Sequence, residues 1–68
     1  MEIIGQKIKE LRLEKGLTQN ILAKDLKITR PALGNYEAGN RPVPSELVLR
    51  IANYFNVTPN FLFGLEDL

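Results

Sequence analysis

The apolar positions at the start of the chain recur at the spacing of an α-helix. Ile4, Ile8 and Leu11 stand at i, i+4 and i+7 with charged residues between them. This pattern predicts an amphipathic helix over roughly residues 3–15, and Gly16 is placed to end it in a left-handed conformation. No stretch alternates between apolar and polar residues in the manner of a strand. We therefore predict an all-α protein.

Capping residues predict where the later helices begin. Thr18, Thr29 and Ser45 each precede a helical pattern and have a side-chain oxygen that can accept the free N–H groups of a first turn. Thr58-Pro59 opens a short last helix, and Asn56 suits a left-handed end to the helix before it. The inward apolar positions are Leu22, Ala23, Leu26, Leu33, Tyr36, Val48, Ile51, Ala52, Phe55, Phe61 and Leu62. This pattern predicts a compact bundle of about five helices.

The connection between the second and third predicted helices is very short, because only Lys27 and Ile28 separate them. Two helices joined so tightly cross at roughly 90–120°, which is the helix-turn-helix arrangement. Small Ala23 permits such a crossing, and Ile28 and Leu33 would fill the angle beneath it. The predicted motif covers about residues 18–38.

The composition argues against catalysis. The 68 residues include no cysteine, no histidine and one serine, Ser45. A disulfide, a thiolate metal site and a Ser–His triad are therefore excluded, and the commonest general base is missing. We expect no cofactor, no metal and no enzymatic activity. The length predicts one domain over residues 1–68. No signal peptide and no apolar run of about 18 residues occurs, so we expect a cytoplasmic protein that does not bind membranes.

The charges are unevenly distributed along the chain. Residues 1–34 carry seven basic and four acidic side chains, whereas residues 35–68 carry two basic and four acidic ones. This arrangement suits a polyanion on one side only, although an ordinary mixed surface would fit the charges equally well. The outer positions of the motif's second helix are Arg30, Pro31, Gly34 and Asn35. None of them is a carboxylate, and an exposed helix of this kind fits the major groove of DNA.

The order of several short motifs resembles the phage repressor/Cro-like helix-turn-helix family, often called the XRE family. The matching pieces are "LTQ", "LA", the "L" and "ITR" on either side of Lys27, "NYEAG", "IANYFNV" and "PNFLFG". Each piece is loose, but together they cover residues 4–64 and are specific. The resemblance implies a lambda-repressor-like fold and sequence-specific binding of double-stranded DNA.

The resemblance also implies which residues read bases. Arg30 and Asn35 match base-reading positions, where arginine can bond guanine and asparagine can bond adenine through two hydrogen bonds each. Pro31 and Ala32 have no side-chain hydrogen-bonding group, but either could contact a thymine methyl. The alternative is that these four residues are ordinary solvated surface.

Phosphate contacts are implied at two places. Thr18 and Gln19 match a phosphate-binding position at the start of a helix, where free N–H groups and the helix dipole favour an anion. Arg41 and the neighbouring Asn40 lie just past the third helix, where the family commonly contacts the DNA backbone. The alternatives are that Thr18 only caps its helix and that Arg41 is an exposed loop cation.

Other charged residues are assigned different roles by the same resemblance. Arg12 and Glu37 match a structural ion pair, with Arg12 also close to a phosphate. Lys7, Lys9 and Lys15 are interpreted as solvated charges.

Three positions depart from the family pattern. Lys27 stands in the turn where glycine is usual, and a left-handed conformation there costs a non-glycine residue roughly 1 kcal/mol. Gly34 lies inside a helix, where glycine costs about 1 kcal/mol relative to alanine. It either permits close approach to DNA or reads nothing. Ile21 replaces a commonly acidic, exposed residue and could pack beneath the loop or against a partner.

Family members generally bind near-palindromic operators as twofold dimers, so we expect a homodimer. The candidate interface residues are Leu47, Leu49, Tyr54, Phe61, Phe63, Leu65 and Leu68. The alternative is that Phe61 and Phe63 close the core and that the tail after them frays.

We therefore predict a transcriptional regulator, most simply a bacterial or phage repressor that covers an operator and blocks polymerase. One rival is an antitoxin or other protein-interaction module that binds a protein partner and uses DNA binding to regulate itself. A second variant is a controller of a restriction–modification locus.

Overall fold

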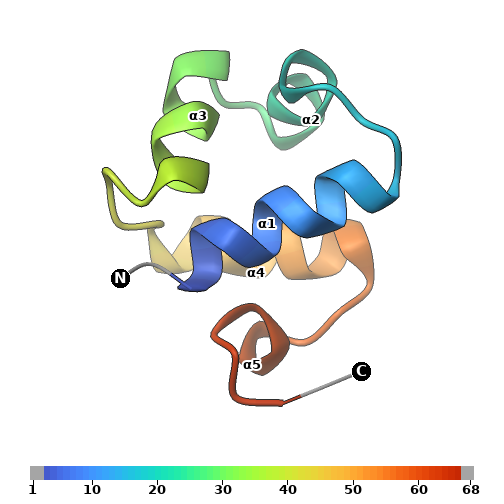
Figure 1. Ribbon diagram of the computed structural model, residues 1–68, viewed down its shortest axis with the longest axis vertical. Coiled ribbons are helices and arrows are strands. Elements are labelled where there is room, and N and C mark those ends of the chain that lie inside the picture. Colours follow the sequence, from blue (N-terminus) through green and yellow to red (C-terminus); the bar gives the residue numbers. More distant parts are fainter. Residues whose placement is uncertain (1–2, 67–68) are drawn as a thin grey trace.

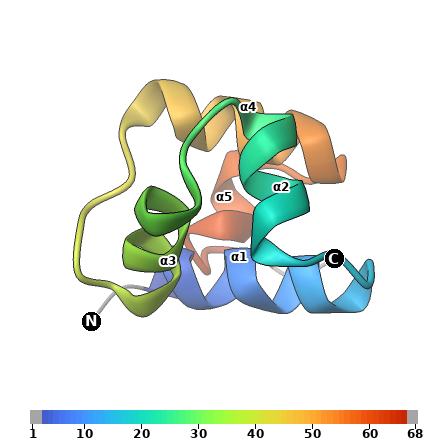
Figure 2. The ribbon, with the colours of Figure 1, turned by 90° about the horizontal axis from the view of Figure 1, so that it is seen from above.

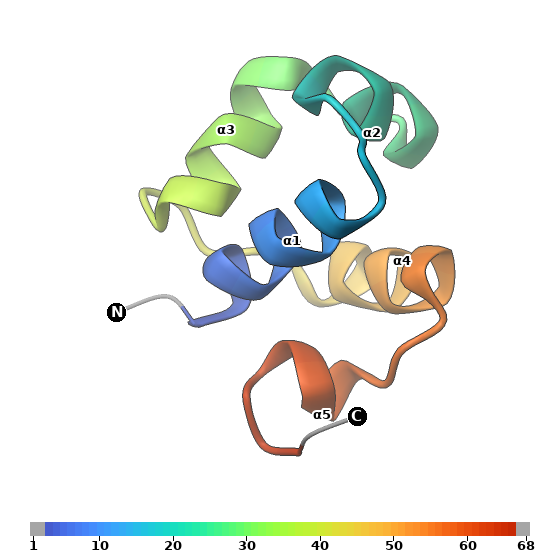
Figure 3. The same ribbon diagram turned by 45° about the vertical axis from the view of Figure 1, so that its right-hand side comes forward.

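The computed structural model describes residues 3–66 and contains five helices and no strand in that range (Figure 1). They are α1 (Ile3–Glu14), α2 (Gln19–Leu26), α3 (Arg30–Ala38), α4 (Ser45–Phe55) and α5 (Pro59–Leu62). The prediction of an all-α bundle is confirmed. α2 and α3 lie together at one end of the molecule, α1 and α4 cross its middle, and α5 lies at the other end, as a second view also shows (Figure 3).

Every helix contributes to one core. The largest side chains with no exposed surface come one from each helix and are Ile8, Leu22, Leu33, Ile51 and Leu62. Seen from above, α2 and α3 lie between α1 and α4 (Figure 2), and α3 packs against both α1 and α2. The predicted inward positions are thus buried or, for Phe61, half-buried against the core. α3 is held on this core by its inner face, which leaves its outer face available.

Most of the predicted helix starts are confirmed by the capping geometry. The hydroxyl oxygens of Thr18, Thr29 and Thr58 each accept a hydrogen bond from the N–H three residues later, at 3.0–3.2 Å. Ser45 was predicted to cap α4, and this is wrong because Ser45 is already helical. Pro44 stands at the cap, since its φ of −60° suits that position and its carbonyl accepts from Val48 N at 2.9 Å.

The helix-turn-helix connection ends α2 in the left-handed conformation, as its shortness requires. Lys27 has φ 61° and ψ 41°, and the next N–H, that of Ile28, donates to Ala23 O at 2.9 Å. Asn56 ends α4 in the same way with φ 57°. Two non-glycine residues therefore adopt a conformation that favours glycine, at roughly 1 kcal/mol each. Ala23 is 2% exposed, which confirms the predicted close crossing.

Gly5 allows α1 and α3 to approach closely, which the sequence pattern did not predict. A Cβ atom at Gly5 would lie 2.1 Å from the carbonyl oxygen of Tyr36. Real atoms do not approach that closely, so any side chain would push the C-terminal end of α3 away from α1. The orientation of α3 therefore depends on a glycine in the first turns of α1.

Two polar contacts attach α4 to the C-terminal half of α2. Arg50 Nη1 donates to Leu26 O at 2.7 Å, where a helix end has carbonyls without helical partners. The Tyr54 hydroxyl donates to Asp25 Oδ2 at 2.6 Å. This hydrogen bond, together with partial desolvation and the Asp25 charge, raises the pKa of Tyr54 above its ordinary value.

None of the helices within residues 3–66 has the length and apolar character of a membrane span. No group of three or more histidine, cysteine, aspartate or glutamate side chains is arranged there to hold a metal ion.

Candidate nucleic-acid interface

The outer face of α3 carries the residues that the sequence assigned to base contacts. Arg30 and Pro31, in its first turn, are exposed, and Ala32 and Asn35 are half-buried. Ala32 packs partly against the core, so it presents less of its methyl group to a ligand than Pro31 does. The structure brings these four side chains onto one short helix. Whether they contact bases stays a prediction.

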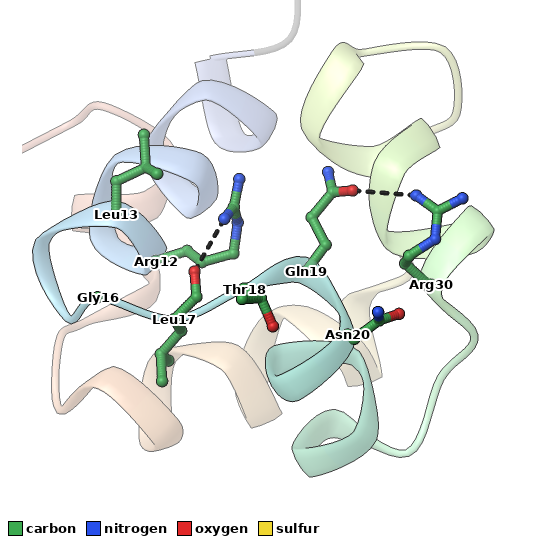
Figure 4. A pocket seen from close by; sticks show the side chains of 8 residues that line it. All are labelled: Arg12, Leu13, Gly16, Leu17, Thr18, Gln19, Asn20 and Arg30. Carbon is green, nitrogen blue, oxygen red and sulfur yellow. Dashed lines mark hydrogen bonds between the residues drawn. The ribbon is translucent and has the colours of Figure 1, made fainter.

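A hollow of about 630 Å³ lies beside this face, at the start of α2 (Figure 4). Its lining residues are Arg12, Leu13, Gly16, Leu17, Thr18, Gln19, Asn20 and Arg30. Among the described residues, those that line it include two arginines and no carboxylate. The free N–H groups of the first turn of α2 also lie here, and a helix start of this kind favours an anion. The site is chemically suited to a phosphate.

A buried ion pair stands beneath the hollow. Arg12 Nε lies 2.7 Å from Glu37 Oε2, and Arg12 Nη2 donates to Glu37 Oε1 at 3.1 Å. Arg12 Nη1 donates to Leu17 O at 2.9 Å, and the two residues are only 8% and 9% exposed. All three nitrogens of the guanidinium are therefore used within the protein. The pair ties α1, the start of α2 and α3 together.

Gln19 connects this pair to Arg30, which sequence reasoning missed. Gln19 Nε2 donates to Glu37 Oε1 at 3.0 Å, and Gln19 Oε1 accepts from Arg30 Nη1 at 3.2 Å. The sequence had indicated only a phosphate contact for Gln19. These partners lie 18 and 11 positions away in the chain. No local periodicity signals them, although all three residues had been singled out separately.

The loop after α3 holds the second pair of predicted phosphate contacts. Asn40 and Arg41 are both exposed, and Asn40 N donates to Asn35 O at 2.9 Å as part of the helix end. Arg41 Cζ lies 5.6 Å from the centre of the Tyr36 ring, in a cation–π contact. Arg41 is thereby kept near the C-terminal end of α3. Its contact with DNA stays a prediction.

Two departures from the family pattern can now be located. A Cβ added at Gly34 would lie 3.9 Å and 4.0 Å from the amide atoms of Gln19, which is ordinary contact. The fold therefore does not require glycine at this position. Ile21 is 47% exposed, so it is not packed beneath a loop.

The predicted dimer residues differ in their exposure and in the residues that they contact. Leu47 is 3% exposed and belongs to the core, because it lies on the face of α4 that packs against the other helices. Its assignment to an interface is therefore wrong. Phe61 is half-buried against the core, with Lys7 Nζ 4.9 Å above its ring. Tyr54, already bonded to Asp25, lines a separate hollow with Lys15, Leu17 and Phe55.

A smaller apolar patch remains exposed across α4 and α5. Leu49 is 57% exposed and Phe63 48%, and together they line a hollow of about 190 Å³. The other residues that line it are Ser45, Val48 and Pro59. We call these five residues the α4–α5 patch. Leu65 is also exposed, and Leu68 lies outside the described residues.

Comparison with known proteins gives a consistent result. The family described as "Helix-turn-helix" matches residues 8–62. The HTH-type transcriptional regulator ImmR of Bacillus subtilis is 32% identical over 65 residues, which are 96% of this chain and 51% of ImmR. The HTH-type transcriptional activator BcrR of Enterococcus faecalis is 35% identical over 64 residues, covering 94% of this chain and 31% of BcrR. The chain thus spans about half of the length of ImmR and about a third of that of BcrR.

A solved structure agrees with the fold. The restriction-modification controller protein C.AhdI from Aeromonas hydrophila has a TM-score of 0.82 and 35% sequence identity, covering 91% of this chain and 94% of C.AhdI. The family match covers most of the chain and includes the whole of α2 and α3. The chain belongs to the XRE-type helix-turn-helix family of DNA-binding transcriptional regulators.

Proposed function

We propose that this regulator is a repressor that binds a near-palindromic operator as a homodimer and acts by occupancy. The observation that carries the proposal is the surface that α3 and the start of α2 form together. That surface combines exposed Arg30 and half-buried Asn35 with an anion-suited hollow and lacks carboxylates among the described residues that line the hollow. In a bacterial or phage setting the protein would act in the cytoplasm, where the chromosome lies.

In this proposal α3 lies in the major groove and α2 crosses the DNA backbone. Arg30 and Asn35 bond base edges, and Pro31 and Ala32 contact them through apolar atoms. Thr18 and Gln19 bind one phosphate at the start of α2, and Asn40 and Arg41 bind another beyond α3. The exposed, cation–π-supported position of Arg41 supports the second contact.

A second copy is proposed to dock on the α4–α5 patch. One recognition helix of nine residues reaches only a few base pairs, which discriminates poorly against competing genomic sites. Half-sites one turn apart are separated by about 34 Å. The longest extent of the molecule is 28 Å, which is shorter than this separation, so contact between two copies depends on side chains that project from their facing surfaces. Leu49 and Phe63 are the large apolar side chains available on that patch.

A second candidate function is control of a restriction–modification locus, which uses the same DNA binding in another circuit. The observation in its favour is the likeness to C.AhdI, which covers 94% of that chain. Expression of a reporter from the natural promoter, with the flanking genes identified, separates the two functions. A neighbouring endonuclease gene would favour the controller.

The experiment that tests the proposal is selection of bound duplexes from a random library at about 0.15 M salt, near physiological screening. We expect enrichment of a palindrome with half-sites about one helical turn apart. Arg30→Ala should lose enrichment at specific base pairs. Lys9→Ala, which removes the same charge from an exposed site on α1, should keep the same consensus. Salt-sensitive binding with no enriched sequence would contradict the proposal.

A further inference from the structure

A continuous chain of hydrogen bonds leads from the buried ion pair to the first residue of α3. It runs from Arg12 through Glu37 to Gln19. The Gln19 carbonyl oxygen then accepts from Arg30 Nη1 at 3.2 Å, and this last bond is drawn in Figure 4. Arg12 and Glu37 are buried, Gln19 is half-buried and Arg30 is exposed. The chain thus begins in the rigid interior and ends at the surface that the proposed function assigns to base contacts.

The chemistry of the two ends fixes the orientation of the Gln19 amide. The carboxylate of Glu37 can only accept hydrogen bonds, so the NH₂ group of Gln19 must face it. The guanidinium of Arg30 can only donate, so the carbonyl oxygen of Gln19 must face Arg30. Both requirements are met by one orientation, and the opposite orientation would fail at both ends.

Resting on the proposed function, we propose that Glu37 is a positioning residue for base readout, acting on Arg30 through the amide of Gln19. One N–H group of Arg30 is held by Gln19, and the remaining N–H groups stay free for a base edge. A long arginine side chain is thereby restricted before DNA arrives. Gly34 lies beside this contact, because a Cβ atom added there would be in van der Waals contact with the Gln19 amide. Since glycine has no side chain, nothing at position 34 covers the contact between Gln19 and Arg30.

Removing the acceptor at position 37 releases the Gln19 amide. Glu37 Oε1 accepts from both Arg12 Nη2 and Gln19 Nε2. In Glu37→Leu no acceptor oxygen remains, so the Gln19 NH₂ group loses its partner and nothing fixes which way the amide faces. Arg30 then loses its anchor although its own sequence and that of Gln19 are unchanged.

The conservative exchange Glu37→Gln is the matched control. Its carbonyl oxygen can occupy the Oε1 position and accept from both Arg12 Nη2 and Gln19 Nε2, so the orientation of Gln19 and its bond to Arg30 are kept. The bond from Arg12 Nε is lost, which lowers the stability of the protein but leaves Arg30 anchored.

The first readout needs no DNA. Nuclear magnetic resonance order parameters of the Arg30 guanidinium should show restricted motion in the wild type and in Glu37→Gln. In Glu37→Leu and in Gln19→Met, the same signals should show free rotation. Gln19→Met leaves the Arg12–Glu37 pair intact, so it decides the question if Glu37→Leu does not fold. Unchanged order in Gln19→Met overturns the positioning role.

The second readout is base discrimination at the base pair whose preference is lost in Arg30→Ala. Discrimination there should fall about tenfold in Gln19→Met and in Glu37→Leu, which is the size of one good base contact. It should stay within about twofold of the wild type in Glu37→Gln. In an Arg30→Ala background, Gln19→Met should cause no further loss at this base pair.

The outcomes distinguish a failure of this inference from a failure of the proposed function on which it rests. An equal loss on all sequences in Gln19→Met, also present in the Arg30→Ala background, would mean that Gln19 only binds phosphate, and it would overturn the inference. A wild-type protein that selects no sequence would overturn the proposed function and the base-reading role with it. The order parameters of Arg30 would still decide whether Glu37 positions that side chain.

Discussion

The polar side chains on the α2–α3 surface differ in how much of their hydrogen-bonding capacity is used within the protein. Arg12 has each of its side-chain nitrogens engaged by Glu37 or Leu17. Gln19 uses one N–H and its carbonyl oxygen, and Arg30 uses one N–H. Within residues 3–66, the side chain of Asn35 takes part in no side-chain hydrogen bond. Only hydrogen-bonding groups that the protein itself leaves unused at its surface are available to bind a base edge.

Asn35→Ala therefore tests base contact without disturbing the protein. We expect operator binding to weaken by about 1–3 kcal/mol, while binding to random DNA stays nearly constant. Fluorescence anisotropy with an operator duplex and a scrambled duplex at one salt concentration measures both. Stability should not fall, because alanine is the better helix former. Equal losses on the two duplexes would contradict base reading by Asn35.

Tyr54 and Asp25 provide a test of the contact between α4 and α2. The hydrogen bond to Asp25, partial desolvation and the Asp25 charge raise the pKa of Tyr54 above 10.0. The stabilisation is therefore fully present below the unfolded-state pKa near 10.0 and is lost as pH rises through the higher folded-state pKa. An NMR titration of the Tyr54 Cζ resonance should show this pKa falling toward 10.0 in Asp25→Ala. Glu46→Ala, which removes an exposed carboxylate elsewhere, should leave it unchanged.

Among the helices, α1 supports the DNA-binding unit from below. Its Gly5 lies against the backbone of α3, and its Arg12 binds Glu37 of α3. Both contacts lie on the side of α3 opposite the predicted DNA surface. The direction in which α3 projects thus depends on how closely α1 packs beneath it.

Gly5→Ala and Gly34→Ala form a matched pair of variants that tests how closely α3 packs on α1. Gly5→Ala places a Cβ at 2.1 Å from Tyr36 O, and overpacking of this kind costs about 1–3 kcal/mol, partly offset by a gain of about 1 kcal/mol in helix propensity. Because the obstruction is backbone, we expect a net loss of about 2 kcal/mol. Gly34→Ala meets only ordinary contact and should stabilise the protein by up to about 1 kcal/mol. Urea unfolding followed by circular dichroism measures both. A shift of the same sign in the two variants would contradict the packing argument.

For the whole molecule, the proposed function uses two separate regions of the surface. α2 and α3 hold the DNA-binding residues, and the α4–α5 patch lies on helices that do not contribute to that surface (Figure 1). A second copy on the patch would therefore leave both α3 helices free to enter DNA. Association and DNA contact can then be separated by mutation.

Leu49→Glu should convert the proposed dimer to a monomer while leaving the fold intact, because Leu49 is 57% exposed. We expect sedimentation velocity to show this change, and affinity for a full palindrome to fall while affinity for a single half-site remains. Leu13→Glu is the control for association, since Leu13 is 58% exposed but lies on α1 beside the DNA surface. It should sediment like the wild type. Identical sedimentation of the wild type and Leu49→Glu would exclude the patch as the dimer surface.

The sequence by itself determined what depends on neighbouring residues. The five helices, the threonine caps at Thr18, Thr29 and Thr58, and the left-handed Lys27 all follow from interactions within a few positions. The short turn also sufficed to predict the helix-turn-helix, because so few residues allow little freedom of crossing. The candidate DNA-binding residues were found because the resemblance assigns roles to positions in a conserved order of motifs.

Only the tertiary structure decided what depends on residues that are distant in the chain. It showed that Gly5 lies against Tyr36, that Gln19 bridges Glu37 and Arg30, and that the surface assignment of Leu47 was wrong. A helical pattern shows which positions are apolar, but not how wide a strip of each helix its neighbours cover. The crossing of the helices sets that width, and it also sets which polar groups meet, because both are properties of three-dimensional packing.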